Sequence, residues 1–197
     1  VSAKVKGIPS EDKLRASLTL DEVKRLADTP CESDVLRRAS FFSILTGLRH
    51  IDIKNLKWKQ ISQTSNGSWR IDISQIKTKV GAYLPISDQA YAMCGTRSED
   101  EELLVFAGLQ NAAWISKPLK KWIEAAGIKK HITFHLSRHS YATLQLELGT
   151  DIYTIKSMLG HTNVKTTQIY SHIVDSAKEK AANTIHIDNL QSQQPII

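Results

Sequence analysis

Two cysteines in a chain of 197 residues are too few for a disulfide framework. Cys31 and Cys94 form no Cys-x-x-Cys pair, and neither lies near a histidine at the spacing of metal ligands. We therefore expect a reduced, intracellular setting and no structural metal site. No run of residues is apolar and long enough to cross a membrane, and the polar residues 1–13 do not resemble a signal peptide.

Charge of one sign is also not in large excess. The 26 lysines and arginines outnumber the 20 aspartates and glutamates, which gives a net charge of +6. This balance is compatible with a phosphate backbone as partner, but it is equally typical of an ordinary basic protein. Charge therefore does not decide the functional class.

The hydrophobic pattern predicts one α-rich domain that contains a small three-stranded antiparallel sheet, an α+β fold. Strands are expected at 58–61, 69–73 and 83–86, because these segments carry β-forming residues and turn signals separate them. Helices are expected at about 19–26, 33–46, 51–56, 88–94, 111–126, 136–148, 151–158, 164–172 and 174–182. We expect residues 18–187 to form the domain, 1–17 to be an interdomain linker or the end of an excised fragment, and 188–197 to be a flexible tail.

Three local signals support these boundaries. Thr19 and Glu22 have the spacing of a capping box, which predicts a helix start. Gly47 follows a hydrophobic helix and predicts its end. Asn66-Gly67 predicts a hairpin between the first two strands.

Large aromatic residues are expected to pack in the core. An indole buries a large apolar area, and a tyrosine on an amphipathic helix usually packs against its neighbours. The residues concerned are Trp58, Trp69, Trp114, Trp122, Tyr141 and Tyr153.

Residues whose side chains suit catalysis occur in four separate segments of the sequence: Thr46–Arg49, Lys77, His135–His139, and Leu159–His161 with Tyr170 nine residues later. A tyrosine hydroxyl can attack phosphorus and keep the bond energy in a phosphotyrosine ester. Two guanidiniums suit the phosphate oxygens, histidines move protons near neutral pH, and a lysine can protonate the leaving oxygen. The set is chemically complete for cleaving a phosphodiester without a metal.

Three of these segments resemble the tyrosine recombinase (phage integrase) family. They are Thr46–Arg49, Phe134–Thr143 and Met158–Tyr170, and both their order and the nine-residue step from His161 to Tyr170 agree with the family. The resemblance covers roughly residues 18–185 and implies the fold of that family's catalytic domain.

The resemblance also implies the role of each candidate catalytic residue. Arg49 and Arg138 would bind the phosphate, His135 would handle a proton, His161 would hydrogen-bond the phosphate, and Tyr170 would be the nucleophile.

The resemblance also covers the remaining candidate residues. Lys77 is expected as the general acid in preference to Lys79, which lies two residues away with the same chemistry. Asp52 matches an acidic position of the family, and the resemblance implies that it orients nearby groups without reacting itself. The other histidines, His139, His172 and His186, are expected to be surface or supporting groups.

As a whole, the resemblance implies a recombinase that cleaves and rejoins a double-stranded DNA attachment site without a metal, ATP or a small-molecule substrate. Four protomers would assemble on two duplexes, and the protein would act in the bacterial cytoplasm, at the nucleoid. Two alternatives stay open: a topoisomerase of type IB, which relaxes plasmids without a matched site, and an inactive DNA-binding regulator, which never forms a covalent adduct.

Overall fold

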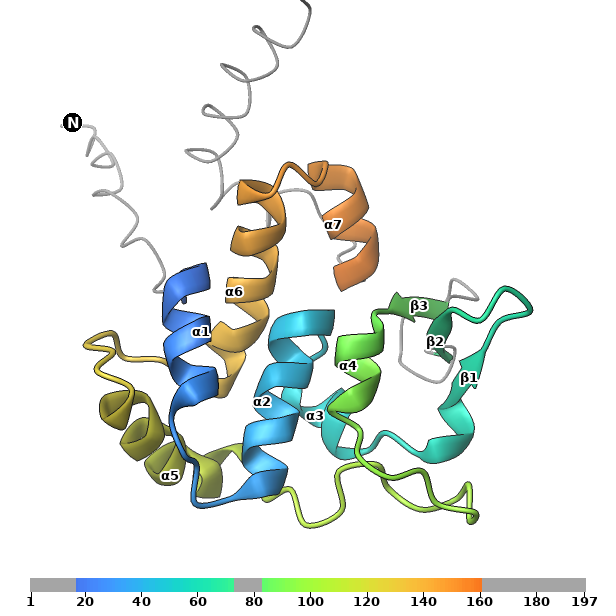
Figure 1. Ribbon diagram of the computed structural model, residues 1–197, viewed down its shortest axis with the longest axis horizontal. Helices are drawn as coiled ribbons and strands as arrows, with labels where there is room; N and C mark the ends of the chain where they lie inside the picture. Colours follow the sequence, from blue (N-terminus) through green and yellow to red (C-terminus); the bar gives the residue numbers. More distant parts are fainter. Residues whose placement is uncertain (1–16, 73–82, 161–197) are drawn as a thin grey trace, which may run out of the picture.

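The computed structural model describes residues 17–72 and 83–160. Within these ranges it confirms a mainly helical fold with a three-stranded antiparallel sheet (Figure 1). The predicted helices at 164–172 and 174–182, the predicted tail and most of the predicted linker lie outside the described residues. None of the described helices is long and apolar enough to cross a membrane.

The described elements follow one another with short connections, apart from the segment that precedes α5 and residues 73–82 between β2 and β3, which lie outside the described residues. In chain order they are α1 (Leu20–Asp28), α2 (Asp34–Thr46), α3 (His50–Lys54), the 3₁₀ helix η1 (Trp58–Gln60), β1 (Ile61–Gln63), β2 (Trp69–Asp72), β3 (Tyr83–Ile86), α4 (Asp88–Ala92), α5 (Ala112–Ala125), α6 (Phe134–Glu147) and α7 (Ile152–Leu159).

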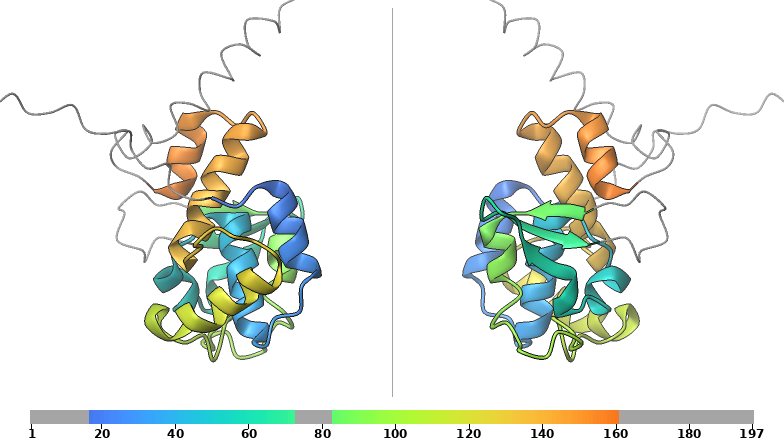
Figure 2. Two further views of the ribbon diagram at one scale, coloured as in Figure 1. Left: turned by 90° about the vertical axis from the view of Figure 1, so that its left-hand side faces the viewer. Right: turned by 90° about the vertical axis from the view of Figure 1, so that its right-hand side faces the viewer.

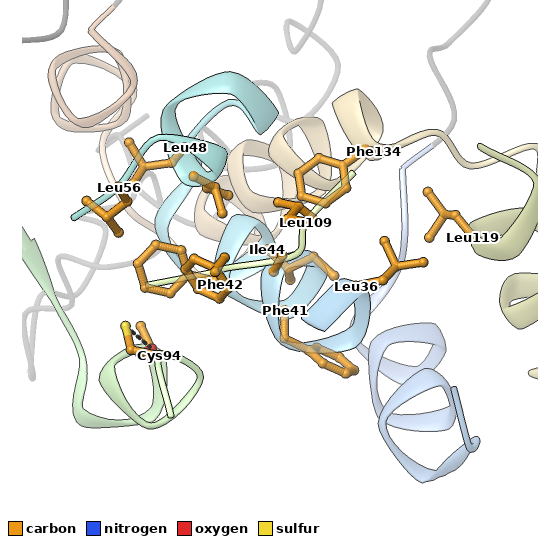
Figure 3. Close-up of a cluster of buried hydrophobic side chains, with 14 of the residues drawn as sticks. Leu36, Phe41, Phe42, Ile44, Leu48, Leu56, Cys94, Leu109, Leu119 and Phe134 are labelled. Atoms are coloured by element: carbon orange, nitrogen blue, oxygen red, sulfur yellow. Dashed lines mark hydrogen bonds between the residues drawn. The ribbon is translucent and has the colours of Figure 1, made fainter. Parts of the chain in front are cut away.

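Helix α2 lies at the centre of the molecule. Helices α1, α5 and α6 lie on one side of it, and α4 with the sheet lies on the other (Figure 1). From Ala39 onward every residue of α2 is buried except the half-buried Leu45. Figure 3 shows Phe41 and Phe42 pointing from this helix into the surrounding core. A helix that is apolar on nearly all sides must be covered by other elements, so the rest of the domain is built around α2.

Local signals set the start of α1 and both ends of α2 as predicted. The Glu22 backbone N–H donates to Thr19 Oγ1 at 3.3 Å, and the Thr19 N–H donates to Glu22 Oε2 at 2.8 Å. Helix α2 begins after Ser33, whose hydroxyl accepts the Leu36 N–H, and it ends at Gly47 in the left-handed conformation. The capping box and the glycine stop are both confirmed.

The sheet has the strand order β1–β2–β3, and both pairs are antiparallel. Ile61, Ile71 and Leu84 are paired across the three strands and are all buried, so one face of the sheet packs on the core. The hairpin predicted at Asn66-Gly67 joins β1 to β2, and Gly67 has a φ of 84°. The sheet faces the viewer in the right-hand view of Figure 2.

The first strand starts later than predicted. Trp58 to Gln60 form the 3₁₀ helix η1 instead of the beginning of a strand. The reason is tertiary, because the backbone N–H of Trp58 donates to the Leu103 carbonyl at 3.1 Å. The guanidinium of Arg97 also lies 5.6 Å from the centre of the Trp58 ring. The segment is therefore held by the loop that precedes α5, and its backbone does not pair with β2.

The prediction of a core role is confirmed for Trp58 and Trp122, each 3% exposed, and is wrong for Trp114, which is 75% exposed. The buried stripe of α5 passes through Ile115 and Leu119 to Trp122. Trp114 lies one residue, or about 100° around the helix, from this stripe. Helical spacing places its indole in solvent.

The remaining predictions of a core role for aromatic residues are confirmed in part. Trp69 is half-buried and stacks on Tyr91 with ring centres 3.5 Å apart. Tyr141 is 2% exposed and packs in the core as expected, whereas Tyr153 is 69% exposed and does not. Tyr153 lies in the first turn of α7, beside the cap formed by Asp151.

Helices α6 and α7 lie side by side and project beyond the other helices (Figures 1 and 2). A small apolar cluster of Tyr141, Ala142, Leu146, Ile155 and Leu159 joins them. The cluster meets the end of α2 at Gly47, where an added Cβ would lie 2.6 Å from side-chain atoms of both Tyr141 and Leu159. Only glycine allows this approach.

We predict that Gly47→Ala lowers the free energy of unfolding by about 2–4 kcal/mol, since a left-handed alanine is strained and overpacking adds a further penalty. Urea denaturation of both proteins measures the loss. Gly149→Ala is the matched control, because Gly149 also has a positive φ of 93° but has nothing within 4 Å of an added Cβ. Equal losses in the two variants would show that crowding at Gly47 contributes nothing.

Candidate active site

The guanidinium of Arg138 connects three helices. Its Nη1 donates to the Gly47 carbonyl at 2.7 Å, and its Nη2 donates to the Leu159 carbonyl at 2.6 Å. Arg138 belongs to the second turn of α6 and is 6% exposed. Three of the sequence motifs are therefore brought together at one side chain, although its partners Gly47 and Leu159 lie 91 residues before it and 21 residues after it.

Both carbonyls lie where a helix ends. Gly47 caps α2 and Gly160 caps α7, each with left-handed backbone, and Leu159 is the last residue of α7. The last carbonyls of a helix have no partner inside it and carry partial negative charge. The cation of Arg138 satisfies one such carbonyl at each helix end, which explains how its charge is accommodated at a buried position.

Arg49 lies two residues after the carbonyl that Arg138 binds. It is exposed and is the N-cap of α3, and its carbonyl accepts the N–H groups of Asp52 and Ile53 at 3.0 Å each. The first turn of α3 thus starts where α2 ends. The structure brings Arg49 and Arg138, the two predicted phosphate ligands, into one region.

Asp52 lies within electrostatic range of both arginines. Burial raises the pKa of its carboxyl above the ordinary value of 3.8, while the charge of Arg49, a hydrogen bond from the Arg49 backbone and the charge of Arg138 act in the opposite direction. A carboxyl in this place can hold two cations near each other without reacting itself. This arrangement agrees with the orienting role expected from the sequence.

His135 and His139 face each other along α6. Their ring centres are 4.8 Å apart and the rings are nearly perpendicular. His135, in the first turn, is exposed, whereas His139 is 9% exposed. Of the two roles predicted for His139, the surface role is therefore wrong and the supporting role fits its contact with His135.

His50 is a supporting residue that the sequence did not reveal. Its Nε2 lies 3.0 Å from the Gln110 carbonyl and must carry the proton, because a carbonyl only accepts. The ring also packs edge-on against Phe134, with centres 5.0 Å apart. Burial lowers the pKa of His50 below its ordinary value. Because it follows Arg49 directly and contacts the first residue of α6, His50 joins the two halves of the site.

Three predicted site residues, Lys77, His161 and Tyr170, lie outside the described residues, as does Lys79. Their neighbours are described. Asp72 at the end of β2 pairs with Tyr83 at the start of β3, so Lys77 belongs to the connection between two adjacent strands. His161 directly follows Gly160, the cap of α7. The catalytic roles of these residues stay predictions.

Comparison with known proteins agrees with this arrangement. The model of the phage integrase family matches residues 16–177. The chain belongs to the phage integrase family. A tyrosine recombinase of Thermosipho africanus is 30% identical over 180 residues, which cover 88% of this chain and 62% of the relative. The tyrosine recombinase XerD of Corynebacterium glutamicum is 48% identical over 71 residues, or 36% of this chain and 23% of the relative.

Solved structures of the family share the fold. A crystal structure of XerA recombinase has a TM-score of 0.66 at 23% identity and covers 92% of this chain and 68% of its own. The catalytic domain of bacteriophage HP1 integrase has a TM-score of 0.62 at 22% identity, covering 90% of this chain and 99% of its own. This chain therefore has the fold of a tyrosine recombinase catalytic domain. The chain spans about 62% of the length of the Thermosipho relative.

We predict that Arg138→Ala lowers the free energy of unfolding by about 2–4 kcal/mol, because two buried carbonyls lose their donor. Arg49→Ala is the control, since the exposed side chain of Arg49 should change stability by less than about 1 kcal/mol. Chemical denaturation of the wild type and both variants provides the values. A loss no larger for Arg138 than for Arg49 would mean that these hydrogen bonds do not stabilise the fold.

We predict that Asp52→Asn stabilises the protein at pH 7 and that this gain shrinks as the pH falls toward 3.8, the ordinary pKa of the carboxyl. A carboxyl whose pKa is higher in the folded state binds its proton more tightly there. The folded wild type therefore loses stability as the pH rises through the range above 3.8, and the neutral asparagine removes this loss. Unfolding free energies of both proteins at several pH values test this. A difference that does not vary with pH would contradict it.

Proposed function

We propose that this chain is the catalytic part of a site-specific DNA recombinase that cuts and rejoins DNA strands through a 3′-phosphotyrosine intermediate. The observation that supports this most is the pair of hydrogen bonds from Arg138 to Gly47 and Leu159. They gather the three motifs whose combined residues suit phosphoryl transfer.

In the proposed reaction, the Tyr170 hydroxyl attacks the scissile phosphorus and the bond from phosphorus to the 5′-oxygen breaks. A tyrosine with a normal pKa of about 10 is only about one part in a thousand ionised at pH 7. Its proton must therefore pass to a neighbouring group, for which His135 is the candidate. Lys77 gives a proton to the departing 5′-oxygen. Reversal by the 5′-hydroxyl of a partner strand rejoins the DNA and releases the tyrosine.

Arg49 and Arg138 would stabilise the charge on the phosphate oxygens, with His161 as a further hydrogen-bond donor. Guanidiniums are permanently charged and offer paired donors that match two oxygens. Since Arg138 is already held by two carbonyls, its plane is fixed before DNA arrives. Donors fixed in advance require little reorganisation when charge develops. Because the bond energy stays in the ester, the proposed mechanism requires neither a metal nor ATP.

The proposed partner is a double-stranded DNA attachment site, bound by four protomers on two duplexes at the bacterial nucleoid. Related structures support a DNA partner: XerH site-specific recombinase is bound to its difH substrate, and a λ integrase dimer is bound to a core site. We also propose that residues 18–187 form the catalytic domain, in keeping with the family match over 16–177.

A covalent-trapping assay tests the proposal. The full-length protein and its Tyr170→Phe variant are incubated with nicked DNA that carries a verified attachment site. We predict a denaturant-resistant protein–DNA band with the wild type and none with the variant, because only the tyrosine oxygen can form the ester.

The other outcomes contradict the proposal in different ways. A band that persists in Tyr170→Phe would place the nucleophile elsewhere. DNA binding without a band from either protein would favour an inactive regulator. Relaxation of supercoiled plasmids that lack the site would favour a topoisomerase.

A further inference from the structure

The segment that joins α5 to α6 presents alternate side chains to solvent. Ile128 and Ile132 are buried and Lys130 is half-buried, whereas Lys129, His131 and Thr133 are exposed. This alternation is typical of an extended chain. We call its exposed side chains the outward row: Lys129, His131 and Thr133. The next exposed residue at the same spacing is His135, so the outward row leads directly to the candidate active site.

Lys130, which lies within this segment but outside the outward row, anchors it to the start of α1. Its ammonium donates to the Ser17 carbonyl at 2.9 Å and to Glu22 Oε2 at 2.7 Å. The Glu22 side chain is 12% exposed and that of Lys130 is 37% exposed, so the carboxylate side of the ion pair is shielded from water. Because Lys130 is held in this way, its two neighbours in the outward row are kept facing solvent.

The outward row borders a positively charged groove. A groove of about 510 Å³ separates the segment from α5, and Lys120, Lys129, Lys130 and His131 line it. Glu124 is the one carboxylate among the lining residues, and it lies 3.7 Å from Lys120. Within the described parts of the chain, Lys129 and His131 form no ion pair of their own. Lys120 and Lys130 are each paired with a glutamate, so the charge of Lys129 is left over as the excess positive charge of the groove.

We propose that the outward row binds phosphates of the DNA backbone on the same duplex whose scissile phosphate lies at Arg49 and Arg138. This inference rests on the proposed function. An extended chain advances about 3.3 Å per residue, so Lys129 lies within about 20 Å of His135 along the chain. Phosphates of one strand advance about 3.4 Å along the duplex axis, so the outward row spans only a few of them.

The side chains of the outward row suit phosphate oxygens. A lysine provides a mobile charge, and the hydroxyl of Thr133 and the imidazole of His131 can donate hydrogen bonds. Thr133 is the N-cap of α6, yet its side chain makes no capping hydrogen bond. Such contacts fix the register of a duplex and carry no sequence information. The outward row would position any attachment site without selecting it.

The test is the salt dependence of DNA binding, measured by fluorescence anisotropy with a short labelled duplex of arbitrary sequence. Each phosphate contact contributes about −0.9 to the slope of log K against log salt. We predict that Lys129→Ala reduces the magnitude of the slope by about 0.9, so that a fourfold rise in salt weakens binding about 3.5-fold less than in wild type. Lys129→Arg should keep the wild-type slope.

Lys121→Ala is the matched control, because it also removes one exposed lysine from the α5 region. Lys121 pairs with Glu32, which lies just before the start of α2. The candidate active site lies at the other end of α2, at Gly47, and the 13 residues of this helix span about 20 Å. The control should keep the wild-type slope. A slope reduced equally by both alanine variants would show an effect of total charge and would overturn the inference.

Two further outcomes separate this inference from the proposed function. Salt-dependent binding by the wild type, with an unchanged slope in Lys129→Ala, would overturn the outward row alone. Absence of DNA binding by the wild type at low salt would overturn the DNA partner, and the inference with it.

Discussion

The hydrogen bonds of Arg138 are the interaction on which the rest of this structure depends. A charge at a buried position is costly unless it is paired or hydrogen-bonded, and the two carbonyls that Arg138 binds belong to helices far apart in the sequence. Satisfying this one cation therefore requires that α2, α6 and α7 all end or begin at the same place. The same requirement places Arg49, two residues after Gly47, and His135, three residues before Arg138, at the rim of the site. Folding and the gathering of Arg49, His135 and Arg138 are in this sense one event.

Close packing reinforces this electrostatic constraint. Gly47 lies so near Tyr141 and Leu159 that no side chain fits at its position. The glycine thus has two functions, since it ends α2 and lets the helix approach the α6–α7 pair. If the helices moved apart to make room, the Gly47 carbonyl would also move away from Arg138. Apolar packing and the buried hydrogen bonds consequently specify the same geometry, and each limits the freedom of the other.

The sequence predicted those parts of the fold that a few neighbouring residues encode. The capping box of Thr19, the stop at Gly47 and the hairpin at Gly67 each depend on contacts within four residues. The strand predicted to start at Trp58 was wrong because a distant segment, the loop before α5, holds residues 58–60 in a 3₁₀ helix. Trp114 was misjudged for a local reason, since it lies off the buried stripe of α5. The joining of Arg138 to Gly47 and Leu159 could not be read from spacing at all, and only the resemblance of the motifs to a family linked them. His50 escaped notice because its partners, Gln110 and Phe134, belong to other elements.

In the function proposed above, the two arginines of the site would divide the task of binding a phosphate. Arg138 is buried and fixed by the protein, so the cost of ordering its side chain is met during folding. Arg49 is exposed, and its long side chain loses rotamer freedom only when it meets a ligand. Asp52 lies within the field of both arginines, and its negative charge offsets part of their mutual repulsion. In the proposed reaction, an approaching phosphate would replace part of that compensating charge. Under the proposed function, a rigid donor beside an adaptable one would let the site select the geometry of the phosphate while it still admits a duplex from solvent.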